Sequence, residues 1–336
     1  MSATVVTPIT LLTGFLGSGK TTLLNHVLAD PAYADTAVIV NEFGDIPVDH
    51  ALVRKSSENV VVLPGGCVCC RVAGDLVNAL RELHFQRAAD AIPPFRRAVI
   101  ETTGLADPAP ILATLIEMPV VAARYSLAGV VTAVDGEHGA RTLDEHAEAL
   151  KQAAVADRLV ITKADLAPAR DLDALAARLA ALNPGARIVR SIRGAIDAST
   201  LFDIGLRRSD ATTQVGAWLN AGAYARAGGG ARHDPSIASF VWATAKPVDW
   251  NALADAFEAL LDTAGERILR VKGLVNVAGE AGPTAIHAVQ HSLYPPAKLA
   301  DWPDADRTTR IVFVVRGLEE SFVARTLNDF LSTVPA

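Results

Sequence analysis

Residues 14–22 read Gly14-Phe-Leu-Gly17-Ser-Gly19-Lys20-Thr21-Thr22. This stretch fits the phosphate-binding loop pattern G-x4-G-K-S/T, in which glycines let backbone N–H groups close around phosphate oxygens. An apolar run precedes the loop and a helix-like run follows it, which is the context that the pattern requires. The sequence therefore predicts that a nucleotide is bound by Gly14, Gly17, Ser18, Gly19, Lys20, Thr21 and Thr22. Lys20 would act on the β- and γ-phosphates as a catalytic residue, and the Thr21 hydroxyl would be a Mg²⁺ ligand.

The composition is that of a globular protein. The chain has 336 residues, half of them hydrophobic and a fifth charged, which suits one large domain or two ordinary ones. The net charge of −6 argues against nucleic-acid binding. The N-terminus lacks the pattern of a signal peptide, and no apolar stretch reaches membrane-spanning length. We therefore expect a soluble, cytoplasmic protein that binds neither nucleic acid nor a membrane.

The first 200 or so residues alternate β-branched runs with longer Ala/Leu-rich runs. This alternation is typical of a parallel sheet covered by helices, and it predicts an α/β P-loop NTPase domain with a mostly parallel sheet. The expected strands are Thr7–Thr13, Ala37–Asn41, Val60–Leu63, Ala98–Glu101, Leu127–Asp135, Leu159–Thr162 and Ile188–Ser191. The expected helices are Thr21–Leu28, Gly74–Gln86, Pro108–Met118, Glu145–Ala154 and Asp171–Leu182.

A glycine run, Gly228-Gly229-Gly230, marks the best domain boundary. Such a stretch cannot pack into a core and suits a linker. We place the first domain at residues 4–215, the linker at 216–235 and a smaller α+β domain at 236–336. The strands expected in the second domain are Ser239–Ala243, Ile268–Val277, Ala285–Leu293 and Arg310–Val315, with helices at Trp250–Leu261 and Glu319–Leu331.

Two acidic segments follow predicted strands. Glu101 ends an apolar run, and a carboxylate at the tip of such a strand is where a P-loop sheet places its Mg²⁺-directed acid. Gly104 follows and would let the backbone approach the γ-phosphate. In Asn41-Glu-Phe-Gly-Asp45, Glu42 or Asp45 could hold Mg²⁺ through water or position the attacking water. An ordinary solvated acidic loop is the alternative for that second segment.

The segment Thr162-Lys163-Ala164-Asp165 closes a predicted strand. It resembles the N/T-K-x-D element with which GTPases select guanine. The Asp165 carboxylate could accept hydrogen bonds from N1–H and N2–H₂ of guanine, whereas adenine offers the wrong pattern. Lys163 could lie along the face of the purine. The sequence therefore predicts a preference for GTP and GDP.

The chain has three cysteines, Cys67, Cys69 and Cys70, which lie within four positions. So tight a cluster cannot form a disulfide framework. Thiolates suit Zn²⁺ or Co²⁺, with Cys67 and Cys69 pointing the same way from an extended segment. Three cysteines leave a structural zinc site incomplete, which favours an ion that is passed on. A redox pair and a buried structural cluster are the alternatives.

The chain resembles the CobW-like family of P-loop GTPases and metallochaperones. In the first domain the resemblance rests on Gly14-Phe-Leu-Gly-Ser-Gly-Lys-Thr-Thr-Leu-Leu-Asn25, Asn41-Glu-Phe-Gly-Asp45, Gly66-Cys-Val-Cys-Cys70, Glu101-Thr-Thr-Gly-Leu-Ala-Asp-Pro108 and Thr162-Lys-Ala-Asp165. In the second it rests on Ile268-Leu-Arg-Val-Lys-Gly-Leu274, Val289-Gln290 and Thr309-Arg-Ile-Val-Phe313. These segments occur in the family's order over nearly the whole chain.

The resemblance implies GTP hydrolysis coupled to delivery of Zn²⁺, Co²⁺ or a similar ion to a client metalloprotein. Many members carry a histidine-rich tract between the domains, whereas residues 221–236 contain only His233. The resemblance therefore favours delivery over storage. A metal buffer or sensor with nucleotide-tuned affinity and a P-loop kinase for a small metabolite are the alternative functions. The sequence leaves the oligomeric state open, with a homodimer as one candidate.

Overall fold

The computed structural model describes residues 6–41, 60–63, 69–202, 204, 219 and 237–332. The chain divides into two compact units, one made of Met1–Leu179 and Ala186–Ile204 and the other of Ala180–Gly185 and Gly205–Ala336. Of the predicted linker, residues 216–235, the structure describes only Leu219, so these domain boundaries stay a prediction. No helix in the described part of the chain is long and apolar enough to cross a membrane.

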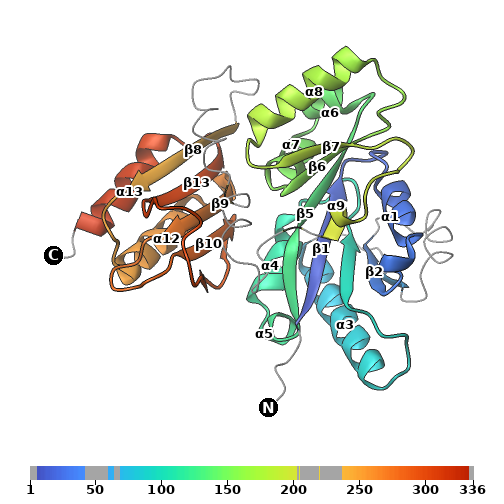
Figure 1. Cartoon of the computed structure of the whole chain (residues 1–336), viewed down its shortest axis with the longest axis horizontal. Helices are drawn as coiled ribbons and strands as arrows, with labels where there is room; N and C mark the ends of the chain where they lie inside the picture. The colour runs from blue at the N-terminus through green and yellow to red at the C-terminus, as the bar shows by residue number, and fades with distance from the viewer. Residues whose placement is uncertain are drawn as a thin grey trace. The chain divides into compact units, whose positions relative to one another are not determined.

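The first unit is built on a seven-stranded sheet in the order β3-β2-β4-β1-β5-β6-β7 (Figure 1). All of its neighbouring strands are parallel. The strands are β1 Thr7–Gly14, β2 Thr36–Asn41, β3 Val60–Leu63, β4 Arg97–Glu101, β5 Tyr125–Asp135, β6 Arg158–Thr162 and β7 Arg187–Arg190. The predicted α/β fold with a parallel sheet is confirmed, and each predicted strand lies within two residues of an observed one at both ends.

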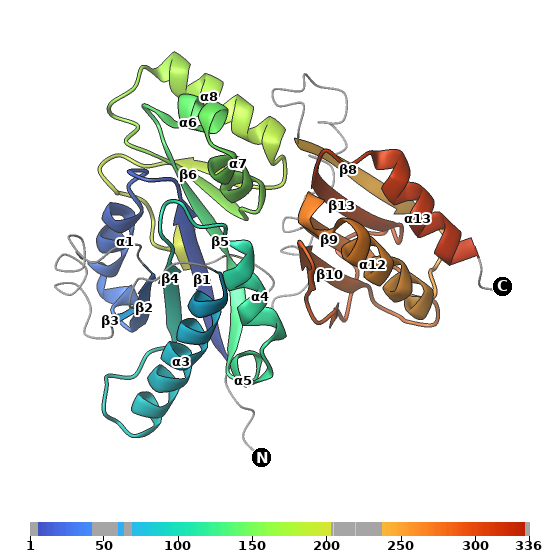
Figure 2. The ribbon, with the colours of Figure 1, turned by 180° about the vertical axis from the view of Figure 1, so that it is seen from behind.

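Helices cover both faces of this sheet because its strands are apolar on both sides. The helices are α1 Lys20–Leu28, α3 Cys69–Ala88, α4 Ala109–Glu117, α5 Pro119–Ala122, α6 Gly139–Glu145, α7 Ala147–Ala154, α8 Ala169–Leu182 and α9 Ser199–Phe202, with a 3₁₀ turn at Pro31–Tyr33. On one face, Leu23 and Leu24 of α1 and Leu201 of α9 join a core formed by alternate strand residues. Helices α3, α4 and α5 pack together on the other face (Figure 2).

Strand β1 lies between β4 and β5. The loop that follows β1 is therefore flanked on one side by the end of β4 and on the other by the end of β5. Leu12 of β1 lies beside Glu101 of β4, and Gly14 lies beside Ala133 of β5. Asp135 at the end of β5 lies beside Thr162 at the end of β6. The carboxyl ends of these strands therefore meet at one edge of the sheet, which is the usual ligand site of an open parallel sheet.

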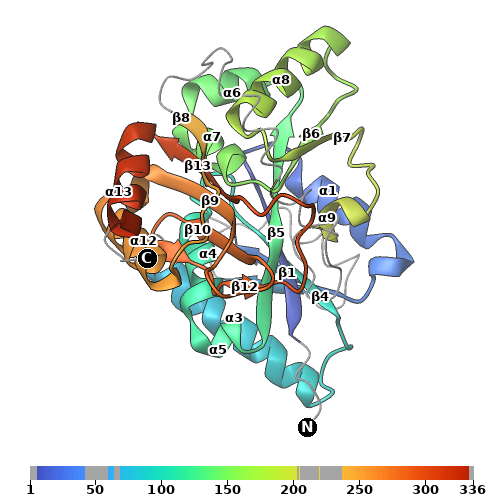
Figure 3. The same ribbon diagram turned by 60° about the vertical axis from the view of Figure 1, so that its left-hand side comes forward.

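The second unit is a smaller α+β domain with a six-stranded sheet in which all paired strands are antiparallel (Figure 3). Its strands are β8 Ile237–Thr244, β9 Ile268–Val275, β10 Thr284–Val289, β11 Ser292–Leu293, β12 Ala297–Lys298 and β13 Thr309–Arg316. Helices α12 Trp250–Ala264 and α13 Glu320–Ser332 lie side by side, and a 3₁₀ turn at Gly265–Arg267 follows α12. Leu253, Leu260 and Phe313 belong to the core between helices and sheet. The predicted α+β class is thus confirmed.

Three predicted elements were wrong in detail. Helix α3 begins at Cys69 and not at Gly74, because a helix tolerates an internal glycine at a cost of only about 1 kcal/mol. The helix predicted at Glu145–Ala154 is two helices, since His146 adopts an extended conformation (φ −130°, ψ 114°) between them. The strand predicted at Ala285–Leu293 is broken at Gln290, whose φ of 49° begins a tight turn.

Candidate functional site

The loop after β1 has the backbone that the phosphate-binding pattern requires. Gly14, Gly17 and Gly19 have φ values of 142°, 70° and 82°, which side chains rarely allow. At Gly14 a Cβ atom would also lie 2.3 Å from the carbonyl oxygen of Ala133. Gly19 is the N-cap of α1, so the loop delivers its backbone N–H groups to the positive end of a helix dipole. The arrangement is suited to binding phosphate.

Lys20 and Thr21 open helix α1, and their side chains contact the preceding loop and the end of β4. The Lys20 Nζ donates hydrogen bonds to the carbonyl oxygens of Gly14 (2.8 Å) and Phe15 (3.1 Å). The Thr21 Oγ1 donates a hydrogen bond of 2.6 Å to Oε1 of Glu101, which is buried at the end of β4. The structure therefore brings Glu101 to the adjacent residues Lys20 and Thr21, although Glu101 lies 80 positions after Thr21 in the chain. A hydroxyl and a carboxylate are the hard oxygen ligands that Mg²⁺ prefers.

The segment after Glu101 lies directly against the phosphate-binding loop. Thr102 Oγ1 donates a hydrogen bond of 2.8 Å to Oγ1 of Thr13 on β1. Two residues later, a Cβ atom on Gly104 would lie only 2.5 Å from the backbone nitrogen of Leu16. Only glycine allows this approach, so the structure explains Gly104 by close backbone packing, and its predicted approach to the γ-phosphate stays a prediction.

The predicted guanine-selecting segment closes the opposite side of the loop. Thr162 Oγ1 donates a hydrogen bond of 2.6 Å to the carbonyl oxygen of Ser18, which ties β6 to the phosphate-binding loop. Lys163 has a φ of 52°, and its ammonium group lies 2.7 Å from Oδ2 of Asp135. The Asp165 carboxylate is about one-quarter exposed (26%) and lies 3.7 Å from Nε of Arg193. Lys163 and Asp165 therefore lie at the same sheet edge as Lys20 and Thr21, while Thr22 is exposed on α1.

Asp135 is a site residue that the sequence reasoning did not select. Burial by itself would raise its pKa, but hydrogen bonds from Lys163 and from the backbone N–H groups of His138 and Glu137 outweigh burial. The pKa of Asp135 therefore lies below its ordinary value, and the carboxylate stays charged beside Lys163. Its position at the end of β5, one strand from β1, is the signal that could have identified it.

We expect Asp135 to make the stability of the first unit depend on pH. Because its folded pKa is depressed, its stabilisation is present above the unfolded value of about 3.9 and is lost as pH falls through the folded pKa. Asp135→Asn should therefore lower the thermal unfolding midpoint near neutral pH and flatten its decline in acid. The exposed Glu148→Gln is the matched control. Identical declines in Asp135→Asn and the unmodified protein would contradict this role.

The loop after β7 also contributes, and no sequence signal pointed to it. Ser191 accepts a hydrogen bond of 3.1 Å through its carbonyl oxygen from the backbone N–H of Ala164. At Gly194, which has a φ of 82°, a Cβ atom would lie 2.8 Å from the carbonyl oxygen of Thr22. The loop therefore packs against both the Thr162–Asp165 segment and helix α1.

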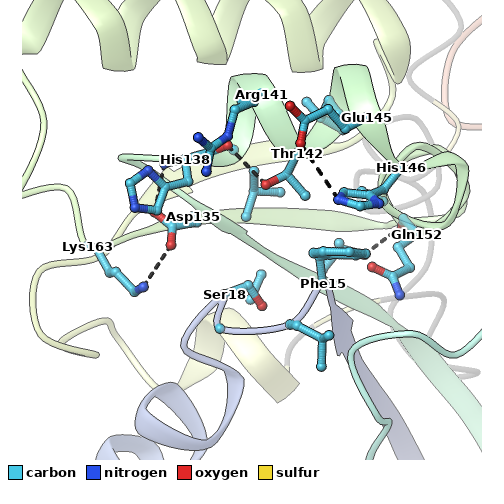
Figure 4. Close-up of a pocket in the computed structure, with 18 residues that line it drawn as sticks. Phe15, Ser18, Asp135, His138, Arg141, Thr142, Glu145, His146, Gln152 and Lys163 are labelled. Atoms are coloured by element: carbon cyan, nitrogen blue, oxygen red, sulfur yellow. Dashed lines mark hydrogen bonds and ion pairs between the residues drawn. The ribbon is translucent and has the colours of Figure 1, made fainter.

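A pocket of about 270 Å³ opens between the phosphate-binding loop, the end of β5 and helices α6 and α7 (Figure 4). Phe15 and His146 line the pocket and stack on each other with ring centroids 4.3 Å apart. Ser18, His138 and Gln152 also line it. The pocket borders the phosphate-binding loop on the side of Phe15 and Ser18, so a ligand in it would adjoin a bound nucleotide.

The remaining predicted site residues are only partly placed. Asp45, Glu42 and Cys67 lie outside the described residues. Cys69 and Cys70 are the first two residues of α3, so the expectation of an extended segment at Cys69 was wrong, because the helix begins there. Within the described ranges, no three His, Cys, Asp or Glu side chains gather closely enough to hold a metal ion.

Both domains of the chain match known protein families. The profile of the CobW/HypB/UreG nucleotide-binding domain matches residues 8–190, and that of the cobalamin synthesis protein cobW C-terminal domain matches residues 237–331. The zinc chaperone YjiA of Escherichia coli is 34% identical over 309 residues, which cover 91% of this chain and 93% of that protein.

Two further proteins show how far the similarity extends. The crystal structure of Zn(II)-bound YjiA GTPase from E. coli superposes with a TM-score of 0.70 at 26% identity, covering 97% of this chain and 99% of that one. Zinc-regulated GTPase metalloprotein activator 1 of Schizosaccharomyces pombe is 31% identical over 216 residues, which cover 62% of this chain and 51% of that protein. Because both domains match and the phosphate-binding loop has the required geometry, the chain belongs to the CobW/HypB/UreG family and carries the cobW C-terminal domain.

Proposed function

We propose that this protein is a GTPase that carries Zn²⁺ and delivers it to a client metalloprotein. The observation that carries the enzymatic half is the hydrogen bond between Thr21 and Glu101 beside the phosphate-binding loop. It joins the two side chains that a phosphoryl-transfer site uses to hold Mg²⁺. The names of the E. coli and S. pombe relatives, a zinc chaperone and a zinc-regulated GTPase activator, support the metal half.

GTP hydrolysis would use the described residues in distinct roles. Backbone N–H groups between Gly14 and Thr21 bind the phosphates, and Lys20 exchanges its two carbonyl partners for phosphate oxygens. Thr21 and Glu101 would hold Mg²⁺, which neutralises phosphate charge when bound. Asp45 is proposed to position the attacking water.

Guanine would be selected between the ends of β6 and β7. Asp165 is accessible enough to accept hydrogen bonds from a base, and the nearby cation Arg193 keeps a positive charge beside its carboxylate. Lys163 is held near the phosphate-binding loop by Asp135, which limits where its alkyl chain can lie. These contacts support the choice of GTP over ATP.

The proposed cargo site consists of Cys67, Cys69 and Cys70. Thiolates prefer soft or borderline ions, so Zn²⁺ and Co²⁺ are the candidates. Cys69 and Cys70 are the first two residues of α3. Strand β3 precedes the cysteines and pairs with β2, which in turn pairs with β4 and its terminal Glu101. Nucleotide and cargo metal would therefore act on neighbouring ends of one sheet. Self-association into a homodimer stays a prediction.

We expect GTP to raise the affinity for the cargo metal at least about tenfold over GDP, or ~1.4 kcal/mol, since a smaller factor would barely direct transfer. Metal must then raise the affinity for GTP by the same factor. The test is a competition titration with Zn²⁺ and with Co²⁺ in the GTP-bound and GDP-bound protein. Affinity should also fall as pH drops, because thiolate ligation releases protons.

The control for this titration is a Cys67/Cys69/Cys70→Ser triple variant, which keeps the size of the side chains and removes the thiolates. Equal metal affinity in both nucleotide states, or unchanged affinity in the triple variant, would remove the delivery mechanism. GTP turnover measured with and without metal separates the proposal from a buffer, in which nucleotide only tunes affinity. Turnover that metal does not affect would favour the buffer.

A further inference from the structure

Helix α7 contacts both of the loops that would surround the γ-phosphate. The residue before its first turn, His146, stacks on Phe15 of the phosphate-binding loop. Lys151 in its second turn forms an ion pair of 2.8 Å with Asp107. The next residue, Gln152, reaches the segment after Glu101. One short helix therefore bridges the phosphate-binding loop and the loop that follows β4.

The amide of Gln152 has a fixed orientation. Its Nε2 donates hydrogen bonds to the carbonyl oxygens of Gly104 (3.1 Å) and Ala106 (3.0 Å), and only the NH₂ end can serve two acceptors. The side chain is fully buried, and its Oε1 has no hydrogen-bond partner among the described residues. Figure 4 shows Gln152 at the edge of the pocket beside Phe15. An unpaired oxygen on a buried amide costs stability, and such groups in native proteins are often found at functional positions.

The two hydrogen bonds from Gln152 hold the backbone at Gly104 and Ala106 in place. The N–H groups of Leu105 and Ala106 donate hydrogen bonds to Thr103 within the same loop. Gln152 therefore fixes the carbonyl side of a turn whose N–H side is bonded to Thr103. Gly104 already lies against Leu16, so the loop is kept close to where the terminal phosphate would bind. We propose that Gln152 is a positioning residue that preorganises the 104–106 loop for hydrolysis, an inference that rests on the proposed GTPase function. Donors that are preorganised before the reaction need no rearrangement during it.

The test compares three variants. Gln152→Met keeps the length of the side chain and removes the amide, so kcat should fall about tenfold or more while GDP affinity changes less than about threefold. Gln152→Glu loses the NH₂ donor but regains one O–H donor when protonated, so its kcat relative to the unmodified protein should recover as pH is lowered. Glu148→Gln on the exposed face of the same helix is the matched control and should change neither constant.

Hydrogen–deuterium exchange of the nucleotide-free protein provides a readout that does not depend on turnover. Amides of residues 102–107 should exchange faster in Gln152→Met than in Glu148→Gln, because the loop has lost both hydrogen bonds to α7. Equal exchange in these variants, or a Gln152→Glu profile that runs parallel to the unmodified protein at every pH, would overturn the inference. Absence of GTP turnover in the unmodified protein would instead overturn the proposed function, and the exchange result would still decide the role of Gln152.

Discussion

Lys20→Ala is expected to abolish GTP hydrolysis. The substitution removes the only side-chain cation of the 14–22 loop, and loss of one preorganised charge at a phosphoryl-transfer site typically costs at least about 10²–10³ in kcat. The measurement is release of inorganic phosphate at saturating Mg²⁺-GTP. The glycines that shape the loop are unchanged, so circular dichroism should show an intact fold. Normal turnover in this variant would contradict the P-loop assignment.

A pair of substitutions at Thr21 controls for nonspecific damage. Thr21→Ser keeps the hydroxyl that donates to Glu101 and should retain most of the activity. Thr21→Ala removes it and should reduce hydrolysis as severely as Lys20→Ala, because an ion ligand is lost. Raising the Mg²⁺ concentration should restore part of the Thr21→Ala activity and none of the Lys20→Ala activity. The opposite pattern would exclude Thr21 as the Mg²⁺ ligand.

Asp165→Asn is expected to change which nucleotide the protein accepts. The carboxylate would make two charge-assisted hydrogen bonds to guanine, and their loss should reduce discrimination by about 3–6 kcal/mol. The amide offers one donor and one acceptor, so binding of GTP should weaken and xanthosine triphosphate should be admitted. Competition binding with GTP, ATP and xanthosine triphosphate measures both effects.

Arg193→Gln is the control for this change. It removes the cation 3.7 Å from Asp165 but leaves the carboxylate in place, so guanine preference should survive. If the preference for guanine were lost in Arg193→Gln, the loop after β7 and not Asp165 would determine selectivity. Equal affinities of the unmodified protein for ATP and GTP would overturn the assignment of Asp165 itself.

Much of this protein could be predicted from its sequence because the relevant signals are local. The phosphate-binding loop is a contiguous stretch whose glycines and lysine have fixed spacing, and its neighbours show the expected strand and helix patterns. Apolar strand runs located all seven strands of the parallel sheet. Glu101, Lys163 and Asp165 could be found because each follows such a run. Element boundaries were less certain, as at α3, because internal glycine and end residues carry weak preferences.

By itself, the sequence determined the fold class, the phosphate-binding loop and the strand-end acids, since these depend on residues near one another in the chain. Only the tertiary structure decided which of the strand ends meet. The order of strands in the sheet places Asp135 against Lys163 and Thr21 against Glu101, which are 28 and 80 residues apart. It also places Gln152 of α7 on the carbonyl oxygen of Gly104, 48 residues away. No local preference encodes such contacts, because they form only when a whole sheet and the helices that cover it have packed together.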